Sequence, residues 1–475
     1  VATATFTAGL SAGIATVTTT AGTVSNSIPV TILSPAVGSI EFGSATPQVI
    51  GVKGGGQTES SSVVFLVKDV NGILAPDGTK VVFKLIGPQG TSTSTPSNLN
   101  QEALTFYSVS TSDGNASTTL LSGTVAGPVQ IVACVDGNSN SLCDTGEISS
   151  SSGPLSIGGG VPSATHFNIA TTLFNLPGLV LSNEEAILTA FIADRFGNFN
   201  ILTGTSVSFY TEAGAIDRSN VTDNTGFTSV NFRTQAPDPE DVAIRADETT
   251  LINALNTKYS LSIPTHPRDG WLIVLATVQG EETFDDANAN GVYDTGESFD
   301  DLGEPFIDKD DDGARDTTPF EEYIDSNGNG AYNGPNGAWD GSGCTGAGCQ
   351  SSKMIWTSST LAFTGNAVYC AISSPELIPF TIPDGDTQSF TFMVGDENTN
   401  ALHPGTTITV KTNAGILAGQ TSVTTPDGLP FGPTEITFSL AEDPSTSTIK
   451  AAVVSVTVSS SKVQGCDLAI SGTVQ

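Results

Sequence analysis

Oxygen-bearing side chains recur at fixed spacing in DDANANGVYDTGE, residues 285–297. Positions 1, 3, 5, 9 and 12 of a twelve-residue loop are Asp286, Asn288, Asn290, Asp294 and Glu297, and Gly291 stands at position 6. Hard oxygen ligands in a flexible loop, one of them a bidentate Glu, suit Ca²⁺ better than Mg²⁺, which requires a tighter octahedron. This loop, called loop 1, therefore predicts a calcium ion.

A second copy of the same order lies far upstream, in VACVDGNSNSLCDTGE at 132–147. Its ligand-type residues, which define the short loop, are Asp136, Asn138, Asn140, Asp144 and Glu147. Position 6 is Ser141 instead of Gly, so the sharp turn is less comfortable there, and a Cys134–Cys143 disulfide is expected to staple the loop.

Two weaker loops follow loop 1. Loop 2 offers Asp308, Asp310, Asp312 and Asp316, with Pro319 at position 12, so Glu321 or Glu322 has to reach back. Loop 3 offers Asp325, Asn327, Asn329 and Asn333, with Asn336 at position 12 and Asp340 as the candidate substitute. Asn in place of Asp lowers the ligand charge, so weak extracellular sites with Kd on the order of 10⁻⁴ to 10⁻³ M are expected.

The competing interpretation is a solvated acidic segment with turn-forming Asp-Gly and Asn-Gly pairs. Two full matches favour an ion, and its role is structural, because so polar a loop cannot order itself by apolar burial. Phe284, Phe299 and Phe306 recur in F-x-D arms that supply a small apolar core. The segment resembles extracellular EF-hand-like or dockerin-like calcium loops, whose flanking helices are short or absent.

Charge and composition limit the partners. The 475 residues include 16 Lys and Arg against 49 Asp and Glu, a net charge of −33. Nucleic acid and anionic membranes are poor partners for such a chain, whereas divalent cations are attracted to it. Gly and Pro are frequent, but 38% hydrophobic residues recur in short alternating runs that indicate a folded, nearly all-β chain of about three domains. No apolar run reaches the roughly 18 residues of a membrane helix.

Six cysteines favour disulfides in an oxidising compartment. Pairing of neighbours predicts Cys134–Cys143, Cys344–Cys349 and Cys370–Cys466, one of the 15 connectivities that six cysteines allow. Zinc is the alternative, but no His lies near these cysteines and their spacing does not form two ligand pairs.

Three copies of one unit organise the chain. KDVNG at 68–72, DRFGN at 194–198 and DENTN at 396–400 each precede two alternating runs separated by Asp, Asn and Gly turns. Short strands at this spacing are typical of a β-sandwich.

The middle copy resembles the bacterial Ig-like domain of invasin- and intimin-type surface proteins, whose hallmark is D-x-x-G-N, then G-T-x-V-x-F, then T-D-x-G. The matching residues are Asp194, Gly197, Asn198, Gly204, Thr205, Val207, Phe209, Thr222, Asp223 and Gly226. The other copies are looser, and in the last one Pro426 lies inside the third motif. The resemblance implies tandem β-sandwiches that serve as rigid stalk segments of adhesins.

Copy spacing locates the calcium-type segment. The first interval is 194 − 69 = 125 residues and the second is 396 − 194 = 202, so the second unit carries about 77 extra residues. Two strand-like runs, 271–282 and 353–365, flank that excess, which places it on the hairpin of the last two strands of the second sandwich. The expected division is 37–160 with the short loop, 161–367 with the insertion 283–350, and 368–475, all Ig-like.

Residues 1–36 are expected to form the last three strands of a further, incomplete Ig-like unit. Three strands of a sandwich expose an apolar face and open edges. Either more chain lies upstream, or a neighbouring molecule supplies the missing strands by β-strand addition, which would make the protein a filament subunit.

A catalytic centre is not expected. The three histidines are scattered, no H-E-x-x-H occurs, and the carboxylates follow calcium-type spacing. Trp271, Trp339 and Trp356 are interpreted as packing residues, with a sugar platform as the alternative.

The sequence thus predicts an all-β, secreted or cell-surface structural protein: a calcium-stabilised stalk or fibre segment of a bacterial appendage or adhesin. Its expected partner is itself, through strand addition or end-to-end assembly. A carbohydrate- or receptor-binding adhesin module is the alternative.

Overall fold

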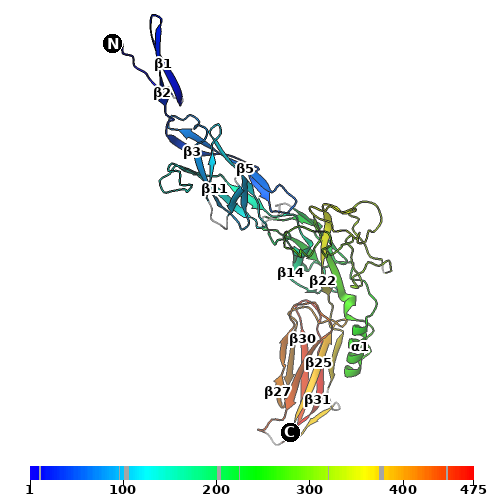
Figure 1. The fold of residues 1–475 in the computed structure, drawn as a ribbon. Coiled ribbons are helices and arrows are strands. Elements are labelled where there is room, and N and C mark those ends of the chain that lie inside the picture. The colour runs from blue at the N-terminus through cyan, green and yellow to red at the C-terminus, as the bar shows by residue number, and fades with distance from the viewer. Residues whose placement is uncertain are drawn as a thin grey trace.

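Strands dominate the computed structural model, which describes residues 1–9, 12–95, 97–100, 106–199, 205–223, 225–318, 320–373, 379–445 and 448–475. A β-hairpin and three β-sandwiches follow one another from the N-terminal to the C-terminal end of an elongated molecule (Figure 1). The expected all-β class is confirmed. Gly204 and Pro319 lie outside the described residues.

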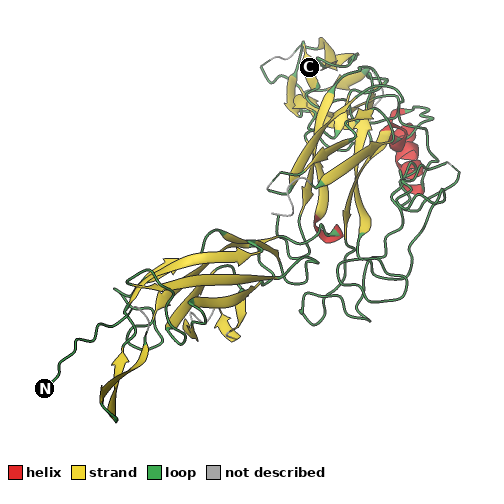
Figure 2. Ribbon diagram, turned by 90° about the horizontal axis from the view of Figure 1, so that it is seen from above, coloured by secondary structure: helices red, strands yellow, loops and turns green. Residues whose placement is uncertain are grey.

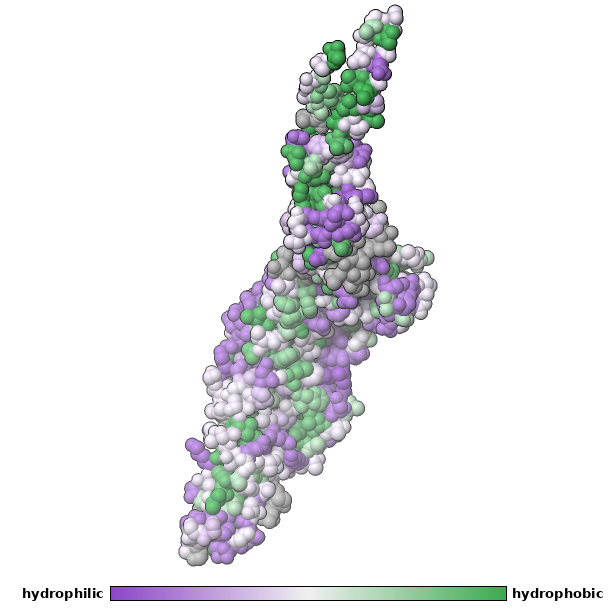
Figure 3. Space-filling model, turned by 60° about the vertical axis from the view of Figure 1, so that its left-hand side comes forward, coloured by the Kyte–Doolittle hydropathy of each residue, from purple (hydrophilic) through white to green (hydrophobic). Residues whose placement is uncertain are grey.

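The N-terminal hairpin pairs β1 (Gly13–Ala21) with β2 (Val24–Ile32) in antiparallel register. Three strands were expected in this region, but residues 1–9 take no strand. Alternating Ala and Thr are compatible with an extended segment. A β-strand also needs a neighbouring strand to pair with, and the alternation does not provide one. Ile14, Val24 and Ile28 are exposed on the hairpin, which is rich in apolar side chains in Figure 3.

The first sandwich packs two sheets on a core that includes Phe65 and Phe83. One sheet has the order β3 (Val37–Thr46), β5 (Ser60–Asp69), β10 (Asn115–Leu121), β7 (Ser92–Thr95) and β8 (Ser97–Asn100). The other has β4 (Val49–Gly51), β13 (Leu155–Gly158), β11 (Gly127–Val135), β6 (Lys80–Ile86) and β9 (Phe106–Ser110), with β12 (Ser149–Ser151) also paired to β11.

The second sandwich repeats this plan around Phe209, Phe232 and Phe363. Its first sheet has the order β14 (Phe167–Thr171), β16 (Glu185–Ile192), β20 (Phe227–Arg233) and β18 (Ala215–Ile216). The second has β15 (Asn175–Leu176), β22 (Lys353–Phe363), β21 (Trp271–Gly280), β17 (Ser206–Thr211) and β19 (Ser219–Val221).

The third sandwich encloses Phe390, Phe392 and Phe438. One sheet has β23 (Tyr369–Ser373), β25 (Thr387–Gly395), β29 (Thr434–Ala441) and β27 (Ile416–Gly419). The facing sheet has β24 (Phe380–Ile382), β31 (Asp467–Val474), β30 (Lys450–Ser459), β26 (Thr407–Thr412) and β28 (Ser422–Thr424).

Burial patterns explain why these segments are strands. Along β16 buried residues alternate with more exposed ones, as expected for a strand with one face on the core. β21 departs from this pattern because nearly all of its residues are buried. Its neighbour Trp356 in β22 donates from Nε1 to the Gly303 carbonyl of the insertion, so the insertion covers the outer face of this sheet.

Both calcium-type segments lie on hairpins. β21 and β22 pair in antiparallel register from Trp271–Ala362 to Gly280–Lys353, and the insertion connects them, as predicted. The short loop connects β11 with β12, which also pair. β11 pairs with β6 in the first sandwich, as β21 pairs with β17 in the second. The two hairpins therefore occupy equivalent places in their sandwiches. The three predicted disulfides are all present: Cys134–Cys143, Cys344–Cys349 and Cys370–Cys466.

One α-helix was not anticipated. α1 (Ala246–Tyr259), red in Figure 2, lies between β20 and β21 in the chain and packs on the third sandwich. Ile252, Leu255 and Tyr259 pack with Met393 of β25. The apolar residues at i, i+3 and i+7 were the signal, diluted by five Thr and Asn residues of the helix that lower its propensity. In the described residues no helix is long and apolar enough to cross a bilayer.

Candidate metal centres

Loop 1 folds around its first carboxylate. Asp286 Oδ1 accepts the N–H of Asn290 at 3.0 Å and Asp286 Oδ2 accepts that of Gly291 at 2.7 Å. Gly291 has φ +78, a left-handed conformation in which glycine is favoured. The closing Glu297 accepts from the N–H groups of positions 2 and 9, Ala287 and Asp294, both at 2.9 Å. These bonds hold the loop closed, with the carboxylates of positions 1 and 12 on its backbone N–H groups.

The same framework recurs in the short loop. Asp136 accepts from Asn140 and Ser141, and Glu147 accepts from Gly137 at 3.0 Å and Asp144 at 2.9 Å. Ser141 adopts φ 61, so the turn forms although the residue is not glycine. The conformation, costly for a residue with a side chain, is held by the loop's own hydrogen bonds and by the Cys134–Cys143 disulfide.

Loop 2 is closed by a carboxylate beyond its twelve positions. Asp308 accepts from Asp312 and Gly313, while Glu321 accepts from Lys309 and Asp316, both at 2.8 Å. Of the two glutamates expected to reach back, Glu321 takes the position-12 role.

Loop 3 is closed from upstream, which corrects the sequence expectation. Asp325 accepts from Asn329 and Gly330, as position 1 should. The N–H groups of positions 2 and 9, Ser326 and Asn333, both donate to Glu304 at 2.9 Å. Neither Asn336 nor Asp340 takes this role. Glu304 stands 21 residues before Asp325, so spacing within the loop could not reveal it.

The acidic side chains of loop 2 fit a cation. Oxygens of Asp308, Asp310 and Glu321 lie within 4.8 Å of one another, as do those of Asp310, Asp312 and Asp316. Oxygens around one Ca²⁺ at about 2.4 Å are at most about 4.8 Å apart, so these spacings suit a shared ion. Asp310 Oδ1 is also buried without a hydrogen-bond partner in the described chain. A buried carboxylate oxygen in that state calls for a positive partner.

Loops 2 and 3 differ in electrostatics. Burial, reinforced by Asp310 and Asp312, raises the pKa of Asp308, and burial also raises that of Glu321. The exposed Asp325 of loop 3 has a lowered pKa, chiefly because Gly330 donates its N–H to the carboxylate. Carboxylate repulsion is therefore concentrated in loop 2, where a cation relieves it most.

The amides of loop 1 link the carboxylate of position 9 to the loop backbone. In loop 1 the Nδ2 atoms of Asn288 and Asn290 each lie 2.7 Å from Asp294 Oδ2. Their Oδ1 atoms accept the N–H groups of Asn290 and Val292, so a half-turn that presents an oxygen ligand to a cation would replace these two bonds.

Loop 1 is attached to the joint between the first two sandwiches. Arg195, inside the D-x-x-G-N motif, pairs with Glu281 at 2.7 Å, and the side chains are 8% and 1% exposed. The same guanidinium donates to the carbonyl of Gly291 in loop 1 at 3.0 Å and to that of Gly54 in the first sandwich at 2.7 Å. One side chain thus connects two sandwiches and a loop. Burial raises the pKa of Glu281 to about 7 against the opposing effect of Arg195.

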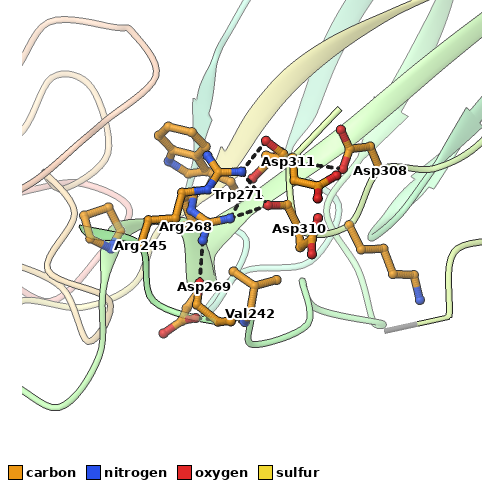
Figure 4. Close-up of polar contacts among 12 residues, drawn as sticks. Val242, Arg245, Arg268, Asp269, Trp271, Asp308, Asp310 and Asp311 are labelled. Carbon is orange, nitrogen blue, oxygen red and sulfur yellow. Dashed lines mark hydrogen bonds and ion pairs between the residues drawn. The ribbon is translucent and has the colours of Figure 1, made fainter. Parts of the chain in front are cut away.

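Loop 2 is attached to the next joint. Arg268, in the 3-10 turn η3 (Pro267–Gly270), donates to the Asp310 carbonyl at 2.5 Å, and Arg245, just before α1, donates to the same oxygen at 2.7 Å. Figure 4 shows both side chains reaching Asp310 and Asp311. η3 also contacts the third sandwich, because Asn400 Nδ2 donates to the Pro267 carbonyl.

The aromatic residues of the insertion form the small core that was predicted. Trp339, 2% exposed, stacks on Tyr293 with centroids 4.9 Å apart and meets Phe284 edge-on. Trp356 packs against Phe306. The third tryptophan, Trp271, donates from Nε1 to the Pro430 carbonyl at the second joint. The three indoles lie in separate packing sites, so they form no common sugar platform.

A cleft of about 1000 Å³ separates the second sandwich from the insertion. Its wall includes Tyr210, Glu212 and Arg218 on one side and Lys309 and Tyr323 on the other.

No protein-family model matches the sequence, and no curated protein matches it. Among solved structures, FdeC, an adhesin of Escherichia coli, is 12% identical over 93% of this chain and 99% of its own, with a TM-score of 0.34. Invasin, a bacterial integrin-binding protein, is 13% identical over 91% of this chain and 60% of its own, with a TM-score of 0.25. Alpha-2-macroglobulin of Escherichia coli is 9% identical over 95% of this chain and 34% of its own, at 0.19. At these identities and TM-scores the likenesses assign no partner or activity to this chain.

Proposed function

We propose that this chain is an extracellular, calcium-stabilised stalk or fibre segment of a bacterial surface appendage or adhesin, without catalytic activity. In this role the sandwiches give the segment its length and carry mechanical load. The calcium loops keep the joints between the sandwiches rigid. The three disulfides support an oxidising, extracellular setting.

The observation that carries the proposal is the attachment of the insertion to both joints. Arg195 binds the Gly291 carbonyl of loop 1 beside the first joint, and Arg268 binds the Asp310 carbonyl of loop 2 beside the second. A polar loop that is ordered by an ion presents these carbonyls in fixed positions. The ions would therefore stiffen the joints indirectly, by fixing the loop carbonyls to which the arginines bind.

Calcium is the ion that the ligands favour. Loop 1 supplies Asp286, Asp294 and Glu297 with two amides, and each loop has at position 6 a residue in the left-handed conformation that the sharp turn requires. Hard, flexible oxygen cages of this kind hold Ca²⁺, with six to eight oxygens, in preference to Mg²⁺. The net charge of −33 raises the local concentration of any divalent cation.

The test is thermal unfolding of the wild type and Glu297→Gln, in millimolar Ca²⁺ and in chelator. We expect chelator to lower the Tm of the wild type. In Ca²⁺ the Gln variant should unfold at a lower temperature than the wild type, because a neutral amide cannot serve as the bidentate ligand. Glu322→Gln is the matched control, since Glu322 lies beside Glu321 but accepts none of the loop's backbone bonds. A wild-type Tm that does not respond to chelator would contradict the proposal.

Fibre assembly is a separate part of the proposal. The β1–β2 hairpin has two strands with apolar side chains such as Ile14 and Val24 exposed. Such a hairpin can accept a strand from another copy. Light scattering across a concentration series should then show growing assemblies for the full chain, and a chain lacking residues 1–33 should remain monomeric. Equal sizes for the two chains would leave the stalk role without self-assembly.

The cleft favours one alternative, a carbohydrate- or receptor-binding module on the same stalk. It presents two tyrosines with both acidic and basic side chains, the mixture that polar ligands require. Glycan-array binding that is lost in Tyr210→Ala and retained in Tyr107→Ala, at a tyrosine of the first sandwich, would support it.

A further inference from the structure

Glu282, just after β21, makes the hydrogen bonds of a position-12 glutamate. Its Oε1 accepts the N–H of Leu302 at 2.8 Å and its Oε2 accepts that of Asp340 at 2.8 Å. Glu297 in loop 1, Glu321 in loop 2 and Glu304 in loop 3 each accept the same pair, from positions 2 and 9. If Leu302 is position 2, Asp301 is position 1.

Asp301 makes the contacts that position 1 requires. Its Oδ1 accepts the N–H of Asn336 at 3.0 Å and its Oδ2 accepts that of Gly337 at 2.5 Å, as Asp286 does with Asn290 and Gly291. Gly337 has φ +79 and Gly291 has φ +78. Asn336 and Gly337 are therefore positions 5 and 6.

Asn336 completes the match. Its Oδ1 accepts the N–H of Ala338 at 2.8 Å, and its Nδ2 lies 2.9 Å from Asp340 Oδ2. In loop 1 the equivalent bonds join Asn290 to Val292 and Asp294. A fourth loop framework of the insertion is thus assembled from three separate segments. The split loop is defined by Glu282, Asp301, Leu302 and residues 336–340.

The split loop has no position-3 side chain, because the chain between Asp301 and Asn336 leaves to form loops 2 and 3. A lysine stands in its place. Lys353 Nζ lies 2.8 Å from Glu282 Oε1, 3.1 Å from Asp340 Oδ2 and 3.9 Å from Asp301 Oδ1. The Asp340 oxygen that it approaches is equivalent to the Asp294 oxygen approached by the position-3 Asn288 of loop 1.

Lys353 is held as a buried cation. Its side chain is 15% exposed, and those of Glu282 and Asp340 are 0% exposed. Burial lowers the pKa of Lys353, but the hydrogen bonds and charges of Glu282 and Asp340 together raise it above its ordinary value. The amine is therefore charged at neutral pH.

We propose that Lys353 is the tethered cation of the split loop and takes the place that Ca²⁺ takes in the other loops. The ammonium balances part of the charge of three carboxylates and cannot be removed by chelator. Lys353 begins β22 and Glu282 follows β21, so the split loop closes the base of the insertion on the sandwich. This base stays ordered without calcium, whereas loops 1 to 3 require it. The inference rests on the proposed calcium function for the identity of the ion.

Removal of the amine should convert the split loop into a metal site. A cavity of about 220 Å³ lies beside Lys353 and is lined also by Asn336 and Glu304, so an ion has room to enter. Lys353→Met keeps the length of the apolar stem and leaves the three carboxylates without a cation.

The experiment counts the Ca²⁺ ions bound per chain by native mass spectrometry and by equilibrium dialysis. It compares the wild-type chain with Lys353→Met and with Lys309→Met. Lys309 is the matched control: its amine pairs with Glu240 at 2.9 Å and Glu322 at 3.4 Å, neither of which closes a loop. We expect one additional ion in Lys353→Met and no additional ion in Lys309→Met. A folded Lys353→Met chain with the wild-type count would overturn the inference.

The count separates this inference from the calcium proposal. If the wild type binds no ion and Lys353→Met binds one, the proposed function fails and the tethered cation stands. If the wild type binds ions and the variant gains none, the reverse holds.

A second measurement uses the wild type alone, so it does not depend on whether the variant folds. Amine acetylation in chelator, followed by peptide mass spectrometry, compares Lys353 with Lys258, which also pairs with a carboxylate at 2.8 Å but is 41% exposed. Slow modification of Lys353, unchanged by chelator, is expected. Modification at the rate of Lys258 would contradict a tethered cation.

Discussion

At the scale of single residues, each loop is defined by the backbone N–H groups that donate hydrogen bonds to its closing carboxylate. The position of that carboxylate in the sequence matters less. Glu297, Glu321 and Glu304 make the same two bonds, although they stand within, after and before their loops. A glutamate can serve at position 12 from any direction, because its two oxygens need only reach positions 2 and 9.

This equivalence gives a prediction for loop 3. Glu304→Gln should reduce the number of bound Ca²⁺ ions by one, since the amide cannot be a bidentate anionic ligand. Isothermal titration and native mass spectrometry measure the count. Glu322→Gln, which alters an exposed acid of the same insertion, should bind as the wild type does. An unchanged count in Glu304→Gln would mean that loop 3 holds no ion.

A buried acid in the cleft predicts a pH dependence. Burial raises the pKa of Glu212 from 4.5 to about 8, and its Oε1 has no partner among the described residues. The folded chain therefore keeps a proton that the unfolded chain loses above about pH 4.5. The free energy of unfolding must fall as the pH rises through that window, by at most roughly 1.4 kcal/mol per pH unit for one proton.

Glu212→Gln should remove this component, because the amide does not titrate. Chemical denaturation from pH 5 to pH 9 tests it, and the variant should gain stability over the wild type toward the alkaline end. Glu185→Gln, on an exposed position of β16, should keep the wild-type slope. Parallel curves for wild type and Glu212→Gln would contradict the raised pKa.

At the scale of elements, α1 braces the second joint. Its buried apolar residues pack on Met393 of the third sandwich, and Tyr259 donates its hydroxyl to Glu435 Oε1 at 2.6 Å. Tyr259 has a pKa raised by burial and by that carboxylate, so the phenol stays protonated and keeps donating. The helix lies between two strands of the second sandwich in the sequence and packs on the surface of the third sandwich.

Loss of one apolar contact should therefore release the helix. Leu255→Ala should destabilise the docked state by about 2–5 kcal/mol, the usual cost of such a truncation in a packed site. Hydrogen exchange of the peptide that covers 246–259 should become faster, while exchange in the sheets changes little. Thr257→Ala, on the exposed side of the same helix, is the control and should retain wild-type protection.

At the scale of the whole molecule, the sandwiches lie end to end, and the joints decide whether they form a rod (Figure 1). The Arg195–Glu281 pair is nearly excluded from solvent, and breaking such a pair leaves an uncompensated charge at a cost of roughly 3–5 kcal/mol.

Arg195→Gln should loosen the first joint. Small-angle X-ray scattering in Ca²⁺ should show a broader distribution of interatomic distances than the wild type, and chelator should broaden the wild type in the same direction. Arg233→Gln removes an exposed pair of the same sandwich, with Asp217 at 3.5 Å, and should leave the distribution unchanged. Identical curves for wild type and Arg195→Gln would show that the arginine does not hold the joint.

The sequence by itself determined what depends on local order. Alternating apolar residues and Asp-Gly or Asn-Gly turns specified strands and sandwiches, because the period of a strand and the backbone freedom of a turn are properties of a few consecutive residues. The longer interval between the second and third copies, with a strand-like run on either side of the excess, placed the insertion on the β21–β22 hairpin. Pairing of consecutive cysteines identified the three disulfides. Ligand spacing proposed loop 1 and the short loop, whose closing glutamates lie inside them.

Tertiary structure alone decided what depends on residues distant in the chain. The role of Glu304 in loop 3 follows from the fold of the insertion and not from its spacing. The same is true of the contacts that Lys353 makes with Glu282 and Asp301. α1 escaped detection because its stability comes from packing on the third sandwich, whereas its own Thr and Asn residues favour a helix weakly. A carboxylate or an amine interacts with the groups that lie near it in space. The fold sets these distances, and the spacing of residues within one segment does not predict them.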